Sequence, residues 1–394
     1  MNQEYVIVSA VRTAIGRYGG TLKNVSSGHL AATVIKEAIK RAGIAPEQVD
    51  EVILGEVRQQ TDESNVARVA ALRAGVPEPS PAFTINRLCA SGMQAVGSAV
   101  QQIAFGLADI VVAGGTENMS LAPYYLRGAR FGGGQAHLVD SNTENGQQPQ
   151  EIFGTQLGMG MTAENVAERF NISREDQDAF AAESQRRAQV AIEHGKFKDE
   201  IVPVEVKERK KTIVFDQDEF PRPGTTVEVL AKLKPAFKEG GTVTAGNACG
   251  RNDGASALVI TTKAKAEELG LKPLAKIVDW TAAGVSPEVM GIGPVPAVQK
   301  LLERTGKSLD DIGLIELNEA FASQALACIR ELNLDPEKVN VNGGGIALGH
   351  PLGSTGSRII VTLLHEMMRR SEKYGIATLC VGGGQGMATM IELV

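Results

Sequence analysis

The stretch ADIVVAGGTENMS (residues 108–120) returns in altered form near the end of the chain as GIATLCVGGGQGMA (residues 375–388). In both, a short apolar run ends in consecutive glycines, which is typical of a buried strand followed by a sharp turn. A second pair, VDEVILGEV (49–57) and DIGLIELNEA (311–320), shows a similar likeness. The two pairs predict a duplicated α/β unit rather than one long sheet, although chance can also produce likeness between such short pieces.

Short apolar runs alternate with segments of helical period around each pair. In the first half we expect strands at 5–11, 51–55, 82–86 and 109–115, and helices at 29–42, 65–74 and 92–105. In the second half the short runs lie at 274–284, 313–320, 340–345, 377–384 and 387–393, with helices after Pro296, up to Leu332 and over 354–370. This βαβ rhythm predicts a mostly parallel sheet covered by helices.

The segment from Met119 to about Gly250 has a different texture. Gly- and Gln-rich loops come first, and a helix then begins at a capping box formed by Ser173 and Asp176. Short strands follow, with a charged run at 208–211 that we expect on a solvated hairpin face, or as an attraction for an anionic ligand. The segment is interpreted as a large insertion over a site.

Composition limits the class of protein. The chain has 394 residues, a net charge of −6 and 43% hydrophobic residues, enough for two or three domains. Its four cysteines form no CxxC pair and no basic, then apolar, leader opens the chain, so we expect a reducing cytoplasm. No apolar run is long enough to span a membrane, and the negative charge argues against nucleic acid as a partner.

A cysteine stands at the joint between a predicted strand and a predicted helix in TINRLCASGMQAVGSAV (84–100). The N–H groups at the start of that helix would stabilise the Cys89 thiolate, and Ser91 and Gly92 would allow a large substrate to approach. The alternative is that Cys89 is a small buried hydrophobic residue.

Three further residues stand among glycines or at strand ends. His350, in VNGGGIALGHPLGSTGSR (341–358), is a natural base for a thiol, or else a packed histidine in a turn. Cys380 ends a strand before a glycine run whose N–H groups could bind an oxyanion, or else belongs to the core. Asn318 lies between a strand and a helix and could be an ordinary N-cap. No metal site is predicted, because HEMMR (365–369) ends in arginine where a zinc motif needs histidine.

Taken together, NRLCASG, GGTENMS, NEAFA, GGGIALGHPLGSTG and CVGGGQG resemble the thiolase family of acetyl-CoA acyltransferases over nearly the whole chain. The resemblance implies an α/β fold with two duplicated halves in a five-layered αβαβα core and an inserted loop domain that holds coenzyme A. The expected domains are residues 1–118 with about 250–270 as the N-terminal half, 119–249 as the loop domain, and 271–394 as the C-terminal half.

The resemblance also implies roles for single residues. Cys89 matches the acyl-accepting nucleophile, His350 the histidine that activates it, and Cys380 the acid/base for the α-proton of acetyl-CoA. Asn318 matches the residue that fixes a water, which with His350 holds the thioester oxygen. The amides of Cys89 and Gly382 would form the other oxyanion site.

Positions of the coenzyme A channel match as well: Arg222, Met159, Ala245, Phe237 and Phe321. The chain departs from the family at three places. Cys249 stands where many members have a serine, Val229 replaces another loop-domain serine, and Gly158 stands where short-chain biosynthetic members carry a histidine. These departures leave the acyl-chain preference open.

The expected reaction is a reversible Claisen condensation of acetyl-CoA with an acyl-CoA, or thiolysis of a 3-ketoacyl-CoA by CoA, through an acyl-Cys89 intermediate. Acetyl-CoA, acyl-CoA and CoA are then substrates, no cofactor is needed, and a homodimer or homotetramer is expected. Two alternatives are a decarboxylating condensing enzyme of the ketosynthase group, against which Cys380 argues, and a lipid- or CoA-binding protein without catalysis, against which the intact HP and NEAF motifs argue.

Overall fold

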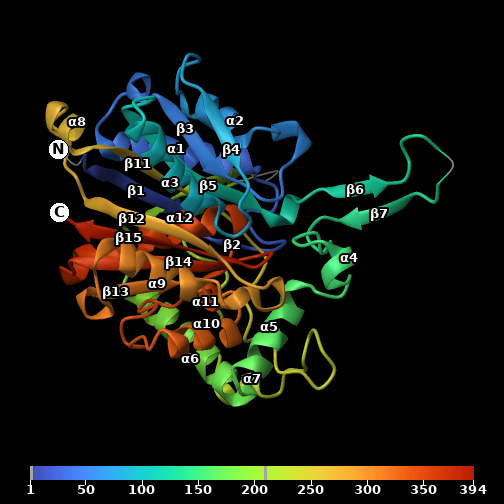
Figure 1. Cartoon of the computed structure of the whole chain (residues 1–394). Helices are drawn as coiled ribbons and strands as arrows, with labels where there is room; N and C mark the ends of the chain where they lie inside the picture. Colours follow the sequence, from blue (N-terminus) through green and yellow to red (C-terminus); the bar gives the residue numbers. More distant parts are fainter. Residues whose placement is uncertain (1–2, 133, 208–210) are drawn as a thin grey trace.

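One continuous sheet runs through the computed structural model, which describes residues 3–132, 134–207 and 211–394 (Figure 1). The strand order is β13 (Leu314–Leu317), β14 (Tyr374–Val381), β15 (Gln385–Leu393), β12 (Ala275–Gly284), β1 (Tyr5–Thr13), β11 (Asn252–Thr262), β5 (Ile110–Asn118), β3 (Glu51–Gly55) and β4 (Ala82–Ile85). The short strands β2 (Gly16–Arg17) and β8 (Ile201–Val202) pair with β11 and β1.

The strand order repeats on either side of the centre. Outward from the centre, β1-β11-β5-β3 in the first half corresponds to β12-β15-β14-β13 in the second, and the two sequence echoes lie on β5 with β14 and on β3 with β13. Three residue pairs, from Tyr5 with Ile277 to Ile7 with Ala275, join the two halves. The sequence predicted two duplicated units instead of one long sheet. The duplication is present, but the expectation of separate sheets is wrong, because the two units are hydrogen-bonded to each other through β1 and β12.

The sheet is mixed, and the prediction of a mostly parallel sheet is wrong. β3 is parallel to β4 and β5, and β13 is parallel to β14. In contrast, β11 is antiparallel to both β1 and β5, and β15 is antiparallel to both β12 and β14. Only the short turn at Gly382–Gly384 separates β14 from β15, and so short a turn can join only antiparallel strands.

The expected short run at 340–345 is not a strand. Val339 makes only an isolated parallel bridge with Ile315, at the place where β4 pairs with β3 in the first half. The Asn340 side chain makes the hydrogen bonds that a neighbouring strand would otherwise make with Leu317. Its Oδ1 accepts from Leu317 N at 2.9 Å, and its Nδ2 donates to Leu317 O at 2.7 Å. Positive φ angles at Asn340 and Gly343 then turn the chain away from the sheet.

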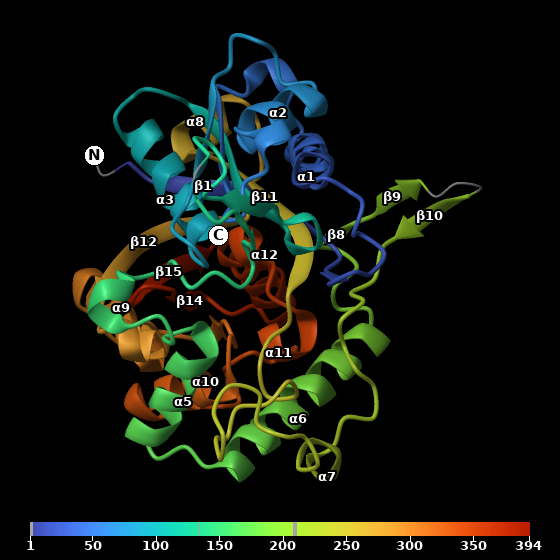
Figure 2. The ribbon, with the colours of Figure 1, turned by 90° about the vertical axis from the view of Figure 1, so that its right-hand side faces the viewer.

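Helices form three layers around the two halves of the sheet (Figure 2). The central pair, α3 (Ser91–Ala104) and α12 (Leu352–Arg370), pack on each other, and α12 contacts strands of both halves. Helices α1 (Ser27–Ala42) and α2 (Val66–Ala74) cover the outer face of the first half, while α9 (Pro294–Thr305) and α10 (Ala322–Glu331) cover that of the second. This arrangement confirms the predicted αβαβα layering.

Capping residues fix where several helices begin. Ser173 accepts from Asp176 N and caps α6 (Arg174–Glu193), as predicted. Asn65, expected as the first helical residue of α2, is its N-cap instead and accepts from Arg68 N at 3.3 Å.

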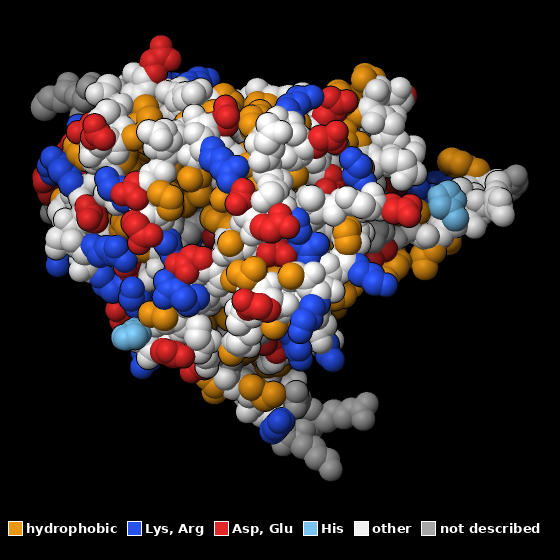
Figure 3. All heavy atoms as spheres, turned by 90° about the horizontal axis from the view of Figure 1, so that it is seen from below, with side chains coloured by type: hydrophobic (Ala, Val, Ile, Leu, Met, Phe, Trp, Pro, Cys, Tyr) orange, Lys and Arg blue, Asp and Glu red, His pale blue; other side chains and the backbone are white. Residues whose placement is uncertain are grey.

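The inserted segment contains short elements and one protruding arm. Its elements are η3 (Met119–Leu121), β6 (Tyr124–Arg127), β7 (His137–Asp140), α4 (Gln150–Phe153), α5 (Met159–Arg169), α6, β9 (Val204–Lys207), β10 (Thr212–Phe215) and α7 (Val227–Leu230). The β6–β7 hairpin extends away from the body and carries hydrophobic side chains (Figures 1 and 3). Residues 208–210 of the charged run lie outside the described residues, and the flanking strands β9 and β10 pair antiparallel.

The remaining short helices are η1 (Pro46–Gln48), η2 (Thr61–Glu63), α8 (Lys263–Glu268), η4 (Pro287–Ile292), η5 (Leu309–Asp311) and α11 (Gly345–Leu348). Within the described ranges, every helix is too short or too polar to cross a membrane.

Candidate active site

Segments from both halves meet at one cavity of about 510 Å³. Cys89 reaches it from the start of α3, His350 from the loop before α12, and Cys380 with Gly382 from the end of β14. The sequence motifs that carry these residues are far apart in the chain, and the fold brings them to a common space.

A strained turn presents Cys89 to this cavity. Leu88 has a φ of 47°, a left-handed conformation that is costly for a residue with a side chain. Asn86 Oδ1 accepts from Leu88 N at 2.9 Å, and the Ser91 hydroxyl accepts from Arg87 N at 2.9 Å and donates to Leu88 O at 2.6 Å. These bonds hold the turn between β4 and α3, so that the half-buried thiol faces the cavity.

The Cys89 thiol is protonated at neutral pH in the resting site. Burial raises the pKa of Cys89, while the N–H groups of Gly382 and of Cys89 itself act in the opposite direction. The expectation that the helix N-terminus would give a stabilised thiolate is wrong for the resting protein, because desolvation outweighs the N–H groups. Cys89 therefore needs a base.

The hydrogen bonds of His350 leave one ring nitrogen free to act as that base. The Thr355 hydroxyl donates to Pro351 O at 2.8 Å, so it accepts from His350 Nδ1–H, 2.7 Å away. Nε2 then carries the lone pair, and it is buried with no hydrogen-bond partner among the described residues. Burial, together with the charge of Arg358, lowers the pKa of His350 to about 3, so the imidazole is neutral.

Two more thiols line the cavity. Burial raises the pKa of Cys380 well above its ordinary value, and the neighbouring Cys89 raises it further. Cys249 also has its pKa raised, to about 12, by burial and then by Cys89. Cys380 is a buried core residue, as one interpretation of the sequence expected, and it also forms part of the cavity wall.

Asn318 is buried but is not among the residues that line the cavity. It is not a helix N-cap, since Phe321 takes that position in α10. Both polar atoms of the Asn318 side chain are buried without a hydrogen-bond partner among the described residues, and a Cβ on Gly345 would lie 2.8 Å from its Oδ1. The neighbouring Glu319 accepts from Ser184 Oγ at 2.6 Å and Ile346 N at 3.2 Å, which ties NEAFA to the glycine-rich segment before His350.

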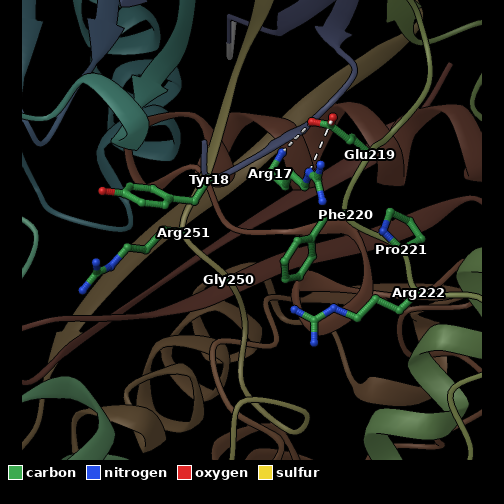
Figure 4. Close-up of a pocket in the computed structure, with 8 residues that line it drawn as sticks. All are labelled: Arg17, Tyr18, Glu219, Phe220, Pro221, Arg222, Gly250 and Arg251. Carbon is green, nitrogen blue, oxygen red and sulfur yellow. Dashed lines mark hydrogen bonds and ion pairs between the residues drawn. The ribbon is translucent and has the colours of Figure 1, made fainter. Parts of the chain in front are cut away.

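The residues expected along the coenzyme A channel fall into three groups. Met159, Phe237, Phe321 and Cys249 line the cavity, and the rings of Phe237 and Phe321 meet edge to face with centroids 6.3 Å apart. Arg222 lies instead in an adjacent pocket of about 460 Å³, with its guanidinium 5.0 Å from the Phe220 ring (Figure 4). Gly250 and Arg251 line both spaces. Ala245 is exposed and lines neither.

Sequence reasoning missed three residues that hold the site in shape. Thr355 fixes the His350 tautomer, and Asn252 Oδ1 accepts from His350 N at 2.9 Å. Glu117 accepts from the backbone N–H groups of Val57, Arg58 and Gly353 and so joins β3, β5 and α12. Two signals in the sequence could have indicated these roles: the acidic residue Glu117 within GGTENMS, and the hydroxyl of Thr355 about one helical turn after His350. In the described part of the chain, no group of three or more His, Cys, Asp or Glu side chains is placed to hold a metal ion.

Comparison with known proteins gives a consistent family. Models of the thiolase N-terminal and C-terminal domains match residues 5–264 and 271–393. The acetyl-CoA acetyltransferase of Syntrophomonas wolfei subsp. wolfei is 54% identical over 398 residues, covering 100% of both chains. The crystal structure of the Bacillus anthracis acetyl-CoA acetyltransferase matches with a TM-score of 0.96 and 51% identity, covering 100% of this chain and 99% of that one.

A more distant structure, human mitochondrial 3-ketoacyl-CoA thiolase in complex with CoA, matches with a TM-score of 0.94 and 45% identity, covering 100% of this chain and 98% of that one. The chain belongs to the thiolase family.

Proposed function

We propose that the protein is an acetyl-CoA acetyltransferase: an acyltransferase that condenses acetyl-CoA with an acyl-CoA and, in reverse, cleaves a 3-ketoacyl-CoA with CoA. The observation that carries the proposal is the single cavity on which Cys89, His350 and Cys380 converge. Thioester chemistry needs a nucleophile, a base for it, and a second base for the α-proton, and this cavity offers one candidate for each.

In the first half-reaction Cys89 attacks the thioester. Because both the thiol and the imidazole are neutral at rest, the proton moves from Cys89 to His350 Nε2 as the C–S bond forms. The amides of Cys89 and Gly382 bind the oxyanion of the tetrahedral intermediate. CoA leaves as its thiol with the proton from His350, and the acyl group stays on Cys89.

In the second half-reaction Cys380 removes the α-proton of acetyl-CoA. Cys380 acts as a thiolate in this step, its own thiol proton having passed to water, and the Cys89 thiolate released at the end of the reaction takes a proton back. The unpartnered side chain of Asn318 would hold a water that, with His350, binds the enolate oxygen. The enolate carbon then attacks the acyl carbon on Cys89 and releases its sulfur.

The proposal assigns coenzyme A to residues 119–249 and their neighbours. Met159, Phe237, Phe321 and Cys249 would line the pantetheine arm, since they wall the cavity beside Cys89. Arg222 would meet the phosphates at the adjacent pocket, and the exposed Ala245 would contact the outer part of the ligand. The domains remain those expected from sequence: 1–118 with about 250–270, 119–249, and 271–394.

The assembly and the compartment form part of the same proposal. Exposed Tyr124, Leu126 and Leu138 on the β6–β7 arm support a homodimer or homotetramer, because monomers rarely leave such a patch uncovered. The catalytic thiols must stay reduced, which supports the cytoplasm.

The test is thiolysis of 3-ketoacyl-CoA substrates of increasing chain length by the wild type and by Cys89→Ala. The matched control is Cys328→Ala, which removes a buried thiol on α10 that does not line the cavity. We expect activity in the wild type and the control and none in Cys89→Ala. A peak at acetoacetyl-CoA indicates a short-chain enzyme and activity up to long chains a degradative one. An inactive wild type that still binds CoA would instead support a binding protein, and decarboxylation of a malonyl thioester a condensing enzyme.

A further inference from the structure

The catalytic cavity and the adjacent pocket of about 460 Å³ meet at Gly250 and Arg251, which line both spaces. A ligand that is bound at Cys89 and is long enough to reach the pocket therefore passes Arg251. A Cβ on Gly250 would lie 2.5 Å from Phe220 Cζ, so the glycine allows the Phe220 ring to lie against the chain at this junction. The junction thus offers a passing ligand bare backbone, an aromatic ring and one guanidinium.

The exposed Arg251 side chain packs on an aromatic ring. Its guanidinium carbon lies 5.8 Å from the centre of the Tyr18 ring, and the two side chains extend in the same direction (Figure 4). The backbone joins the same two residues, because Arg251 O accepts from Tyr18 N at 3.1 Å. A guanidinium that lies over a ring keeps the N–H donors at its edge available to an anion.

The acidic residues of this region are bound by other groups. Glu219 lines the same pocket, accepts from Arg17 N at 3.1 Å and lies 3.7 Å from Arg17 Nε. Asp253, two residues after Arg251, accepts from Ser120 N at 3.0 Å and from the Ser120 hydroxyl at 2.6 Å. Within residues 3–132, 134–207 and 211–394, no carboxylate forms an ion pair with Arg251, so its charge remains available to a ligand.

Arg222, on another wall of the pocket, shows the same arrangement. Its guanidinium carbon lies 5.0 Å from the centre of the Phe220 ring, and its side chain extends beneath that ring (Figure 4). The pocket therefore holds two guanidinium groups packed on rings, those of Arg222 and Arg251. Guanidinium groups bind phosphate oxygens in charge-assisted hydrogen bonds, and aromatic rings stack on a nucleotide base. The pocket suits the nucleotide end of a ligand.

We infer that Arg251 binds a phosphate of the CoA nucleotide and makes the enzyme selective for CoA thioesters over thioesters of the same acyl group that lack this phosphate. The inference rests on the proposed thiolase activity of the same site and adds a residue that sets its specificity for the thiol carrier. The diphosphate and the 3′-phosphate of CoA both offer oxygen acceptors to a guanidinium, and the experiment separates them. Tyr18 acts through Arg251 and is a positioning residue.

The experiment uses the acetoacetyl thioesters of CoA, dephospho-CoA and pantetheine as acyl donors, with CoA as the common acceptor. In a ping-pong reaction kcat/KM for the donor reports the first half-reaction alone, so the acceptor does not affect the comparison. The readout is the ratio of kcat/KM for acetoacetyl-CoA to that for acetoacetyl-pantetheine. It is measured in wild type, Arg251→Met, Arg251→Lys, Tyr18→Leu and the control Arg304→Met, which removes an exposed arginine that pairs with Asp279.

We expect the ratio to fall by about 5- to 50-fold in Arg251→Met, to fall less in Arg251→Lys and to stay at the wild-type value in the control. Tyr18→Leu should also lower it less, because Arg251 keeps its charge and loses only the ring that orients it. The change should appear in KM and not in kcat, since the phosphate is bound equally in the ground state and the transition state. A similar fall for dephospho-CoA assigns the diphosphate to Arg251, and a fall for CoA alone assigns the 3′-phosphate.

Two results would overturn the inference. Arg251→Met could leave the ratio within about twofold of its wild-type value, or it could lower kcat/KM equally for the CoA and pantetheine thioesters, which would separate Arg251 from the phosphates. In both cases, cleavage of acetoacetyl-CoA by the wild type leaves the proposed function standing. Failure of the wild type to cleave any of the three thioesters would refute the proposed function, and the inference with it.

Discussion

Replacing Thr355 by valine removes the hydroxyl that fixes His350 in its basic tautomer while keeping the shape of the side chain. His350 Nδ1–H loses an acceptor 2.7 Å away in a buried position. An unsatisfied buried donor costs roughly 1–3 kcal/mol. The imidazole can avoid that cost by rotating or by moving its proton to Nε2, and either change removes the base that Cys89 needs.

If the full cost appears in the transition state, kcat for thiolysis of acetoacetyl-CoA should fall by about 5- to 150-fold. Thr355→Ser is the matched control, because it keeps the hydroxyl but loses a buried methyl group. We expect the serine variant to be active and slightly less stable. The valine variant should be impaired in kcat, and its melting temperature should also fall, because Pro351 O loses its donor. A valine variant within about twofold of wild type in kcat would refute the assigned tautomer.

Three further predictions concern the surroundings of the site. Burial and the nearby Glu117 raise the pKa of Glu56 to about 8 from an ordinary 4.5, so its contribution to stability is complete below about pH 4.5 and is lost as the pH rises to about 8. Glu56→Gln should therefore flatten the fall in melting temperature between those two pH values. An unchanged slope would contradict the raised pKa. Cys380→Ser should still form the acyl-enzyme from acetyl-CoA but lose condensation, as followed by CoA release and by acetoacetyl-CoA absorbance; equal loss of both steps would argue against its separate role. Gly353→Ala would place a Cβ 2.5 Å from Thr116 O and 2.8 Å from Glu56 Cα and should destabilise the fold by about 1–3 kcal/mol or more. Gly254→Ala, whose added Cβ would have its nearest neighbour 3.4 Å away, should be tolerated. Equal melting temperatures for the two variants would contradict this packing.

The sequence was sufficient for the elements and the chemical groups of the site because both depend on local patterns. The strand-to-helix joint at Cys89, the glycine run after Cys380 and the glycines around His350 are readable within a few residues. The direction of a strand cannot be read in this way, because a buried apolar run looks the same in a parallel and an antiparallel pair. The sequence therefore did not predict the mixed sheet. The break at Asn340 was missed because its side chain supplies hydrogen bonds that a pattern assigns to backbone.

The electrostatic state of the site could not be read from sequence either. A helix N-terminus predicts a stabilised thiolate at Cys89, but the burial that reverses this depends on loops distant in the chain. Asn252 and His350 are likewise close only in the folded protein.

The most direct test of the account is mass spectrometry of the intact protein after brief mixing with acetyl-CoA alone, followed by peptide mapping. The account predicts that one acetyl group is added per chain, on the peptide containing Cys89, that it is removed by free CoA, and that Cys89→Ala does not acquire it. An active wild-type enzyme that carries no acetyl group on Cys89, or carries it on Cys380 or Cys249, would contradict the central claim.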